Sequence, residues 1–509
     1  MIGDSWTRRA WIRSTAATCS ALAFAGLDPG SARGNDKRTL VVTEIGTRRE
    51  LFVDRHLIES LNGVSLLLQH PEPQEIAIEC DQPWEGSACG YFRVLKDGTK
   101  YRMWYMAFHW PFEPEETAPR HPFYVAYAES ADGIVWKKPD LGLHEFQGSK
   151  KNNICCTDVI DNFTPFLDAN PQCPSDARYK AVGVGKGGLL AFQSPDGLQW
   201  KRLQEQPIIA KGAFDTQNIA FWDASIGRYR AYIRDFHNGI RDIRTCTSAD
   251  FHTWTEPEVL QFAPGTPDEQ LYTNGVDPYY RAPHLYLGFP TRYVERKWSP
   301  SMRALPDVKH RELRSKVEMR IGTAITDGLL MSSRDGKTFE RWGEAFVRNG
   351  PERPGTWVYG DCYQAHGLVE TAGKFPGSAP ELSFYLPENY WHRVAKMRRY
   401  TLRIDGFVAA RAPLSGGELV TKPVRFAGKK LSLNLATSAA GSVRVELQDA
   451  EGKPLPGHSA DDCDELFGDT LDRTVSWKDN SDVSAVAGQP VRIRFVLRDA
   501  DIYSYQFAS

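Results

Sequence analysis

Residues 130–136 read SADGIVW and residues 194–200 read SPDGLQW, so one short pattern occurs twice in the chain. Each copy places Asp-Gly between two extended segments. This dipeptide favours a tight hairpin turn, because glycine accepts the positive φ that such a turn requires. Related copies stand at residues 248–254 (SADFHTW), 333–339 (SRDGKTF) and, in degenerate form, 403–407 (RIDGF). These five segments, here called the tags, predict five β-hairpins.

Two further extended segments precede each tag. The segment directly before each tag is rich in aromatic residues: 100–108, 178–185, 228–236, 284–293 and 382–386. The earlier segments are 91–95, 163–167, 217–222, 271–280 and 364–370. With the strand after the tag, each unit has four strands, and recurrent four-stranded antiparallel units are typical of β-propeller blades. We therefore expect an all-β fold with a five-bladed β-propeller over residues 36–412; ordinary hairpins of a β-sandwich are the alternative.

The pattern changes after a turn-rich linker near residue 413. Residues 431–435, 442–447 and 491–497 place apolar side chains at every second position, as half-buried strands do. We expect a C-terminal β-sandwich over residues 413–509. Within the propeller region, the Lys- and Arg-rich residues 296–320 are expected to form a loop insertion, and such loops commonly shape a binding site.

The N-terminus resembles a bacterial twin-arginine export signal. Arg8 and Arg9 precede a short, weakly apolar stretch and then small and turn-forming residues. We expect residues 1–35 to be this signal and the protein to be periplasmic or extracellular. No other apolar run reaches the roughly 18 residues that span a bilayer, so no membrane span is expected.

The composition excludes several classes of protein. The chain has 509 residues, of which 41% are hydrophobic and 25% charged, which excludes a disordered chain. Its formal net charge is −2, so no overall positive field favours a nucleic-acid partner. No Cys-x-x-Cys pair is present, and no metal ligands are predicted. The oligomeric state stays open.

An acidic residue stands at the start of each predicted blade. The innermost strands of a propeller converge on a central channel, so these side chains are expected to point into one pocket. They are Glu85, Asp161, Asp215, Glu269 and Asp361. For any single one, a turn or cap role is the more common explanation. Glycoside hydrolysis needs two carboxyl groups that face each other across the scissile bond, one protonated and one ionised. The coincidence of five acids therefore favours a catalytic pocket.

Aromatic and polar residues near the same strand starts are expected to bind the substrate. The apolar face of a sugar stacks on Trp or Tyr, while its hydroxyl groups bond to polar side chains. The candidates are Trp84, Gln217, Asn218, Arg234, Tyr272, Asn274, Arg292, Trp357, Asp361 and Gln364. By contrast, Trp136, Trp200 and Trp254 in the tags are expected to pack between blades.

Several segments carry a resemblance to a known family. Residues 51–54 (LFVD), 83–86 (PWEG), 214–223 (FDTQNIAFWD) and 326–336 are similar to segments of exported bacterial propeller proteins of unassigned activity. More broadly, the chain resembles the five-bladed propeller glycosidases of the arabinanase, invertase and levansucrase type.

The resemblance implies catalytic roles for acids of the first three blades. A base or nucleophile would be Glu85, an orienting acid Asp161 and a general acid Asp215. The invertase motif Asn-Asp-Pro-Asn-Gly is absent, and blade three has Asp where a Glu acid is usual. Glu269 is therefore a rival acid, and Asp54, Asp277 and Asp361 are lesser candidates.

We thus expect an exported glycoside hydrolase that acts on a plant or algal polysaccharide or oligosaccharide. No cofactor is required for this chemistry, and a structural Ca²⁺ in the propeller channel is left open. The alternative is a carbohydrate-binding propeller without catalysis. A sialidase is disfavoured, because the tag is one residue shorter than the Asp-box and no Arg triad or Tyr nucleophile is identified.

Overall fold

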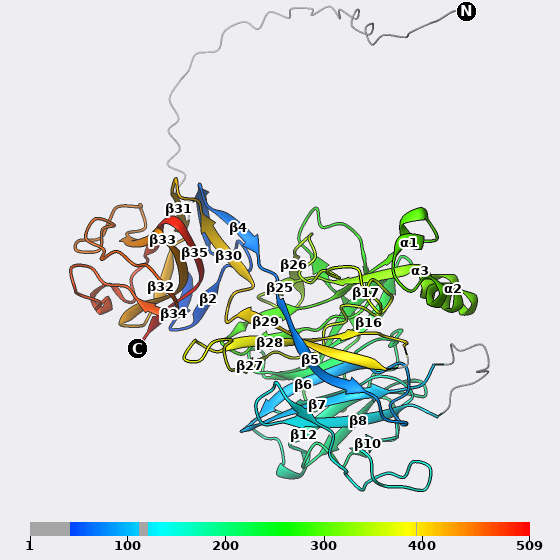
Figure 1. Cartoon of the computed structure of the whole chain (residues 1–509). Coiled ribbons are helices and arrows are strands. Elements are labelled where there is room, and N and C mark those ends of the chain that lie inside the picture. Colours follow the sequence, from blue (N-terminus) through cyan, green and yellow to red (C-terminus); the bar gives the residue numbers. More distant parts are fainter. Residues whose placement is uncertain (1–40, 111–120, 393) are drawn as a thin grey trace, which may run out of the picture. The chain divides into compact units, whose positions relative to one another are not determined.

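The computed structural model describes residues 41–110, 121–392 and 394–509 (Figure 1). The export signal predicted for residues 1–35 lies outside the described residues. Strands make up most of the regular structure, as the sequence predicts. The α-helices among the described residues are short and all belong to one insertion: α1 (Pro300–Ala304), α2 (Val308–Val317) and α3 (Met319–Thr323).

Five antiparallel sheets of the kind predicted for propeller blades follow one another along the chain. The first contains β6 (Gly90–Asp97), β7 (Lys100–Ala107), β8 (Tyr124–Ser130) and β10 (Ile154–Cys156), with β9 (Trp136–Lys137) beside β8. The second contains β11 (Phe163–Leu167), β12 (Tyr179–Gly185), β13 (Gly188–Ser194) and β14 (Lys201–Arg202). The third contains β15 (Ile219–Asp223), β16 (Arg228–His237), β17 (Ile240–Ser248) and β18 (Glu258–Val259).

The fourth and fifth sheets take additional strands from elsewhere in the sequence. The fourth contains β21 (Asp277–Tyr279), β22 (Ala282–Gly288), β25 (Met331–Ser333) and β26 (Thr338–Arg341), with β19 (Gln261–Phe262) parallel to β26. The fifth contains β27 (Val369–Thr371), β28 (Glu381–Glu388), β29 (Ala395–Arg403) and β5 (Glu72–Cys80). Since β5 precedes the first sheet in sequence and completes the last one, it links the two ends of this region.

Four of the five tags form the predicted hairpin turns, and their Asp side chains hold them. The hairpin predicted at residues 403–407 is wrong, because β29 and the strand that follows it, residues 408–412, belong to different sheets. In the second tag, Asp196 Oδ1 accepts hydrogen bonds from the backbone N–H groups of Leu198 and Gln199, both at 2.9 Å. The Ser194 hydroxyl donates to the same carboxylate at 2.9 Å and accepts from the Gly197 N–H at 2.9 Å. The same bonds recur in the tags at residues 130–136, 248–254 and 333–339.

Each tag also contacts the sheet that precedes it. Trp104 of the first sheet donates its indole N–H to the Gly197 carbonyl of the second tag at 2.8 Å. Tyr232 of the third sheet donates to Gly336 of the fourth tag at 2.8 Å. The remaining contacts join Phe166 to Phe251, Tyr279 to Asp405, and Tyr385 to Gly133. The last of these joins the fifth sheet to the first tag, so the five sheets contact one another in cyclic order.

The tryptophans of the tags pack in clusters that contain residues of two neighbouring sheets, as expected. Trp136 packs edge-on against Tyr385 of the fifth sheet, with ring centroids 5.6 Å apart. Trp200 packs on Phe163 of its own sheet, at 5.0 Å, and against a cluster that also contains residues of the first sheet. Trp254 packs on Phe251 within its own tag, at 5.6 Å, and against a cluster that also contains residues of the second sheet. Contact with the neighbouring sheet is thus made as much by the turn carbonyls as by the tag tryptophans.

The expected strand at residues 284–293 is wrong as a single strand. β22 ends at Gly288, and β23 (Thr291–Glu295) begins a separate sheet with β20 (Gln270–Leu271) and β24 (Ala324–Gly328). Pro290 lies between the two strands and has no N–H to donate to a ladder, which explains the break. The expected loop at residues 296–320 is also corrected, because it contains α1 and α2 and the start of α3.

The C-terminal strands recruit strands from the N-terminal end of the described chain. β31 (Gly417–Thr421), β33 (Lys430–Gln448), β34 (Asp469–Thr474) and β35 (Arg492–Ala508) are joined by β2 (Arg49–Leu51), β3 (Ile58–Asn62), β4 (Ser65–Leu68) and β30 (Val408–Ala412). β1 (Thr43–Gly46) pairs with β32 (Val424–Phe426). Short 3₁₀ helices occur at Ser175–Ala177 and Ser484–Val486. The range 36–412 therefore includes strands that pair with the C-terminal region, and a separate hydrophobic core fills that region.

The turn chemistry gives a stability prediction. Asp196→Ala removes the acceptor of two backbone N–H groups, and we expect it to lower the free energy of unfolding by about 1–2 kcal/mol. Burial acts to raise the pKa of Asp196, but the N–H groups of Gln199 and Leu198 hold it below its ordinary value. The difference from wild type should therefore be complete at neutral pH, begin to shrink as the pH falls below about 4, and be lost as the pH falls through the lowered pKa of Asp196 in the folded protein.

Urea unfolding at pH 7 and pH 3 measures this difference. Asp140→Ala is the control, because Asp140 is exposed and makes no hydrogen bond within the described residues. Equal destabilisation by Asp196→Ala at both pH values would contradict the role assigned to the ionised carboxylate.

Candidate active site

A cavity of about 370 Å³ opens where the first three sheets begin. Asp161 lies two residues before β11, and Asp215 lies four residues before β15. The other walls come from the start of β6, the end of β7, the helical insertion and the segments that follow β20 and β28. Two of the four predicted catalytic acids, Asp161 and Asp215, therefore share one cavity.

The two carboxyl groups differ in environment. Burial raises the pKa of Asp161 to about 7, and the negative charge of Asp215 acts in the same direction. The side chain of Asp215 is 60% exposed and lies 3.5 Å from the guanidinium of Arg234. Near neutral pH the cavity thus holds one carboxyl group that retains a proton beside one that has a cationic partner.

A second set of bonds fixes the positions of these acids. Asn162, the neighbour of Asp161, donates from its amide to the Phe214 carbonyl at 3.1 Å, and Asn218 donates to the same carbonyl at 2.9 Å. Phe214 directly precedes Asp215, so the two turns that carry the acids are tied together. Asn218, predicted to bind substrate, instead holds these turns together. Asn162 was not among the residues predicted from the sequence.

Tyrosine hydroxyl groups form a chain that ends on Asp215. Tyr272 donates to Asp215 Oδ1 at 3.2 Å, and Tyr359 donates to the Tyr272 hydroxyl at 2.8 Å. The guanidinium of Arg234 lies 5.5 Å from the centre of the Tyr272 ring. Arg234 and Tyr272, both predicted substrate ligands, therefore lie at the candidate site, where they contact Asp215.

Aromatic residues that the sequence did not single out form the largest wall. Phe108 and Phe123 stack with ring centroids 4.0 Å apart, and Trp110 stacks on Trp391 at 5.7 Å. The remaining aromatic lining residues are Tyr91, Tyr359 and Tyr390. The sequence did not single them out because aromatic residues are frequent throughout the five sheets. Such a wall supplies flat apolar surface on which a sugar ring can stack.

One glycine is required by this wall. Gly360 has φ of +95°, and a Cβ at this position would lie 2.0 Å from Cδ1 of Tyr390. A larger residue there would displace Tyr390 from the cavity.

The helical insertion contributes Val317, Glu318, Arg320 and Ile321 to the cavity. Its first helix starts at a Ser-Pro pair, where the Ser299 hydroxyl accepts from the Met302 N–H at 3.1 Å. The expectation that this segment shapes a binding site agrees with this lining. The Ser299-Pro300 cap was the available sequence signal for a helix.

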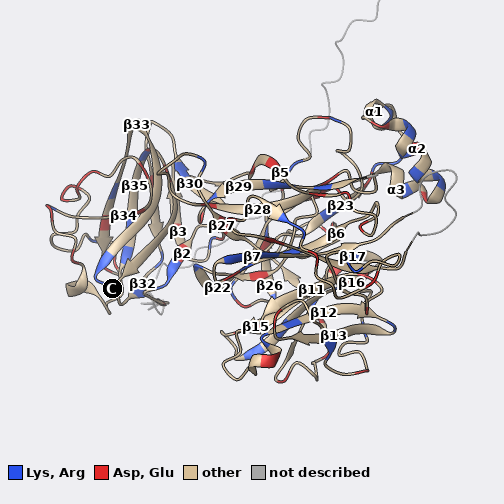
Figure 2. Cartoon of the chain, turned by 60° about the horizontal axis from the view of Figure 1, so that its bottom comes forward, with Lys and Arg blue, Asp and Glu red and all other residues tan. Residues whose placement is uncertain are grey.

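Two arginines of the insertion anchor it to the segment at residues 356–359. Figure 2 shows basic residues along α2. Arg311 is 1% exposed and donates to the carbonyls of Trp357 at 2.8 Å and Thr356 at 3.1 Å. Arg314 is equally buried and donates to the Tyr359 carbonyl at 3.2 Å. Burial and the neighbouring Arg311 lower the pKa of Arg314 to about 9.

Glu85 and Glu269 do not reach the candidate cavity. Glu85 is fully buried and accepts from Lys138 Nζ at 2.7 Å and from the Tyr105 hydroxyl at 2.5 Å. Burial raises the pKa of Glu85 despite the attraction of Lys138. Glu269 lies between Arg292 and Arg341, each at 3.0 Å. Both acids are engaged by other side chains in the fold.

The other predicted substrate ligands also lie elsewhere. Trp84 donates to Asn153 at 2.6 Å, and Arg292 forms a two-pronged ion pair with Asp327. Asp361 is buried and accepts from the Trp357 N–H at 2.8 Å, and burial raises its pKa to about 7. Trp357 lines a different cavity. The buried polar residues Gln217, Asn274 and Gln364 are also outside the candidate cavity lining.

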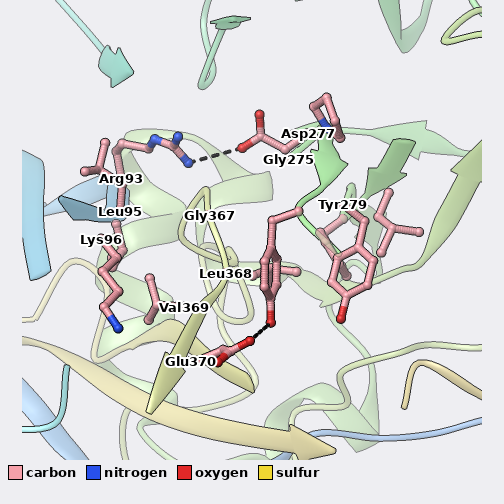
Figure 3. Close-up of a pocket in the computed structure, with 15 residues that line it drawn as sticks. Arg93, Leu95, Lys96, Gly275, Asp277, Tyr279, Gly367, Leu368, Val369 and Glu370 are labelled. Carbon is pink, nitrogen blue, oxygen red and sulfur yellow. Dashed lines mark hydrogen bonds and ion pairs between the residues drawn. The ribbon is translucent and has the colours of Figure 1, made fainter. Parts of the chain in front are cut away.

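A larger cavity, of about 440 Å³, lies further along the innermost strands (Figure 3). Arg93 reaches Asp277 at 3.3 Å, and His366 lies 2.7 Å from the same carboxylate. Burial acts to raise the pKa of Asp277, but His366 and Arg93 hold it below its ordinary value. Glu370 accepts from Tyr280. Asp54, the remaining lesser candidate, pairs with Arg334. Asp277, Glu370 and Asp54 are thus each held by another side chain. The cavity of about 370 Å³ that contains Asp161 and Asp215 is therefore the candidate active site.

The described residues contain neither a cluster of metal ligands nor a helix that could span a membrane. No group of three or more His, Cys, Asp or Glu side chains there is placed to hold a metal ion. The Ca²⁺ considered for the channel therefore gains no acidic ligand set from these residues. No helix in the same ranges combines the length and apolar character needed to cross a membrane.

Sequence comparison finds two uncharacterized relatives. No family model matches the chain. Two uncharacterized proteins from strains of Mycobacterium tuberculosis are each 30% identical over 115 residues, which is 22% of this chain. The match spans 32% of the length of those relatives.

Comparison with solved structures finds carbohydrate-active proteins. The catalytic domain of Coprinopsis cinerea GH62 alpha-L-arabinofuranosidase has a TM-score of 0.41 and 9% identity over 66% of this chain and 97% of its own. Bombyx mori GH32 beta-fructofuranosidase has a TM-score of 0.39 and 9% identity over 86% of this chain and 93% of its own. An N-acetylgalactosamine deacetylase from F. plautii has a TM-score of 0.42 and 12% identity over 67% and 96%.

Glycosidases are therefore among the structural neighbours of this chain, in agreement with the family resemblance seen in the sequence. All three TM-scores lie below 0.5, and all three identities lie below 25%.

The environment of Asp161 gives a direct prediction. Asp215→Asn removes the neighbouring negative charge, so the pKa of Asp161 should fall below about 7. It should stay above its ordinary value, because the burial that contributes most to the rise remains. Titration of ¹³C-labelled aspartate carboxyl groups by NMR measures the change.

Glu318→Gln is the matched control for this titration. Glu318 lines the same cavity but is not among the groups that shift Asp161. An Asp161 pKa that is unchanged in Asp215→Asn, or that moves as much in Glu318→Gln, would contradict the coupling of the two acids.

Proposed function

We propose that the protein is a glycoside hydrolase that acts on a plant or algal polysaccharide or oligosaccharide. The observation that carries the proposal is the pair Asp161 and Asp215 in one aromatic-lined cavity, with the pKa of Asp161 near 7 and Asp215 beside Arg234. A glycosidase needs this difference, since one carboxyl group must give a proton while the other is negative.

In the proposed reaction Asp161 is the general acid. Its proton passes to the glycosidic oxygen as the bond between that oxygen and the anomeric carbon breaks, so the leaving sugar departs as an alcohol. Asp215 supplies the negative charge, either as the nucleophile or as the base that takes a proton from the attacking water. Arg234 and Tyr272 hold the Asp215 carboxylate in place by contacts of 3.5 and 3.2 Å.

This assignment differs from the roles implied by the family resemblance. That resemblance gave Asp161 an orienting role, Asp215 the acid role and Glu85 the role of base or nucleophile. Glu85 is engaged by Lys138 and Tyr105 away from the cavity. The more buried of the two cavity acids is Asp161, so we assign the proton to it.

We also propose that the five sheets form a closed five-bladed propeller and that the C-terminal strands form a β-sandwich. The cyclic contacts of the tags and the completion of the fifth sheet by β5 support the first proposal. The separate core around Val445, Trp477 and Phe495 supports the second.

The catalytic assignment predicts a pH dependence. The acid must be protonated, so kcat/KM should fall as the pH rises through about 7. Asp161→Asn should lower activity on a natural glycan by about 100-fold or more. It should lower activity less on an aryl glycoside, whose leaving group needs no proton, and the loss of rate at high pH should disappear. Hydrolysis of a panel of plant and algal polysaccharides and aryl glycosides measures these effects.

Asp361→Asn is the matched control for the pH profile. Burial raises the pKa of Asp361 to about 7 as well, but Asp361 lies outside the candidate cavity. This variant should keep the wild-type decline of kcat/KM at high pH, because Asp361 does not line the candidate cavity. Loss of the high-pH decline in Asp361→Asn, with Asp161→Asn unchanged, would refute the assignment. Glycan binding without hydrolysis across the whole panel would support the carbohydrate-binding alternative.

We further propose that the protein is exported through the twin-arginine signal at residues 1–35. Replacing Arg8 and Arg9 together with lysine should leave the precursor in the cytoplasmic fraction, because the paired arginines define this signal. Arg13→Lys is the control and should be exported normally. Export of the double variant at the wild-type level, measured by cell fractionation, would contradict the proposal.

A further inference from the structure

Two cavities outside the candidate active site adjoin each other. One has a volume of about 500 Å³ and the other about 600 Å³. Both are lined by Arg348, Asn349 and Gly350, so they lie on either side of one short segment. We call the two cavities together the arginine groove. Each volume is within the usual range for a small-ligand site of about 300–1,000 Å³.

Positive charge predominates in the arginine groove. Its arginines are Arg292, Arg296, Arg348, Arg353 and Arg398. The lining carboxylates are Asp327 and Glu344, and Glu388 pairs with both Arg353 and Arg398. Glu269 also touches Arg292 but is held by Arg341 as well. The guanidinium groups thus outnumber the carboxylates that face them.

Two of these arginines are free to bind a ligand. Arg296 and Arg348 are both exposed, and within the described residues neither makes an ion pair or a side-chain hydrogen bond. Arg292, by contrast, is already held by Asp327 at 2.6 Å. A guanidinium group presents a planar set of donors that matches the oxygens of a carboxylate or sulfate group. Arg296 and Arg348 therefore provide places for anionic groups of a ligand.

Other lining residues suit a sugar. Trp357 lines the first cavity and Tyr400 the second, and both are partly exposed. The indole N–H of Trp357 donates to the Gly350 carbonyl at 2.9 Å, which fixes the ring beside the shared segment. Glu344 is exposed and offers acceptor oxygens to hydroxyl groups. Each cavity thus combines an aromatic surface with charged groups.

The groove and the candidate active site share a wall. Trp357 lines the groove, while Tyr359, two residues later, lines the candidate active site. Along β23, Arg292 and Val294 line the groove, whereas Tyr293 belongs to the aromatic cluster around the active site. Successive side chains of a strand point to opposite faces, so the two sites lie on opposite faces of this strand.

We propose that the arginine groove binds the acidic sugar units of a polysaccharide through their carboxylate or sulfate groups. The proposal names the class of glycan that the protein recognises. It rests on the proposed function only in one respect, namely that the bound glycan is also hydrolysed. A nucleic acid is the less suitable anionic polymer, because the whole chain has a net charge of −2 and lacks an overall positive field.

The test measures binding separately from hydrolysis. Calorimetry is carried out on the full protein carrying Asp161→Asn, with oligogalacturonate, a sulfated galactan oligosaccharide, neutral arabino-oligosaccharides and a single-stranded oligonucleotide as probes. We expect one of the two acidic oligosaccharides to bind, with affinity that falls as salt is added. The acidic probe that binds identifies the source of the anionic group. Adding Arg296→Gln and Arg348→Gln should weaken its binding by about tenfold.

The control for this experiment is the pair Lys453→Gln and Arg473→Gln. It changes the net charge by the same amount at exposed residues that do not line the groove, and it should leave the affinity unchanged. The proposal is overturned if no acidic oligosaccharide binds, if neutral oligosaccharides or the oligonucleotide bind more tightly, or if the groove variants bind like the control. Binding with no hydrolysis by the unmodified protein would leave the groove assigned and refute only the proposed hydrolase.

Discussion

The hydrogen-bonded tag is the interaction on which the rest of the fold depends. In four of the five tags an Asp carboxylate accepts two backbone N–H groups, and a Ser hydroxyl completes the turn. The turn then offers a carbonyl or a ring to the preceding sheet, as Gly197 does to Trp104. A local bond that satisfies the turn thus also sets the contact between neighbouring sheets. Because the contacts follow a cyclic order, the starts of the innermost strands converge, and the cavity with Asp161 and Asp215 forms at that point.

The convergence of the strand starts explains why two aspartates of one cavity have different environments. Asp161 is held by the turn before β11, where burial raises its pKa to about 7, while Asp215 stays exposed beside Arg234. Transfer of a carboxylate from water into a poorly solvated site disfavours its charged form, and a neighbouring negative charge adds to this effect. The bond from Asn162 to the Phe214 carbonyl keeps the two turns together. The electrostatic difference is therefore a consequence of how the sheets meet.

The sequence predicted the repeating units well because their signals are local. An Asp-Gly turn and alternating side chains depend on neighbouring residues, so four tags and most strands were found. Which of the acids line the cavity was harder to predict, because the position of Glu85 or Asp161 depends on residues that are distant in sequence. Lys138 and Tyr105 engage Glu85, and neither is adjacent to it in sequence. The insertion shows the same limit, since Arg311 and Arg296 look alike in sequence, yet Arg311 is buried on backbone carbonyls and Arg296 is exposed.

Backbone strain is also present in the walls of the two proposed sites. Tyr91 and Trp391 line the candidate active site, Phe214 precedes Asp215, and Trp357 lines the arginine groove; all four have positive φ, between 38° and 64°. Bulky residues rarely adopt this conformation, which costs about 1–3 kcal/mol and persists only where the surroundings impose it. For Trp357 the surroundings are visible, because its N–H donates to Asp361 and its indole to Gly350. Asp361, first expected at the catalytic pocket, thus holds an aromatic residue in the wall between the two sites.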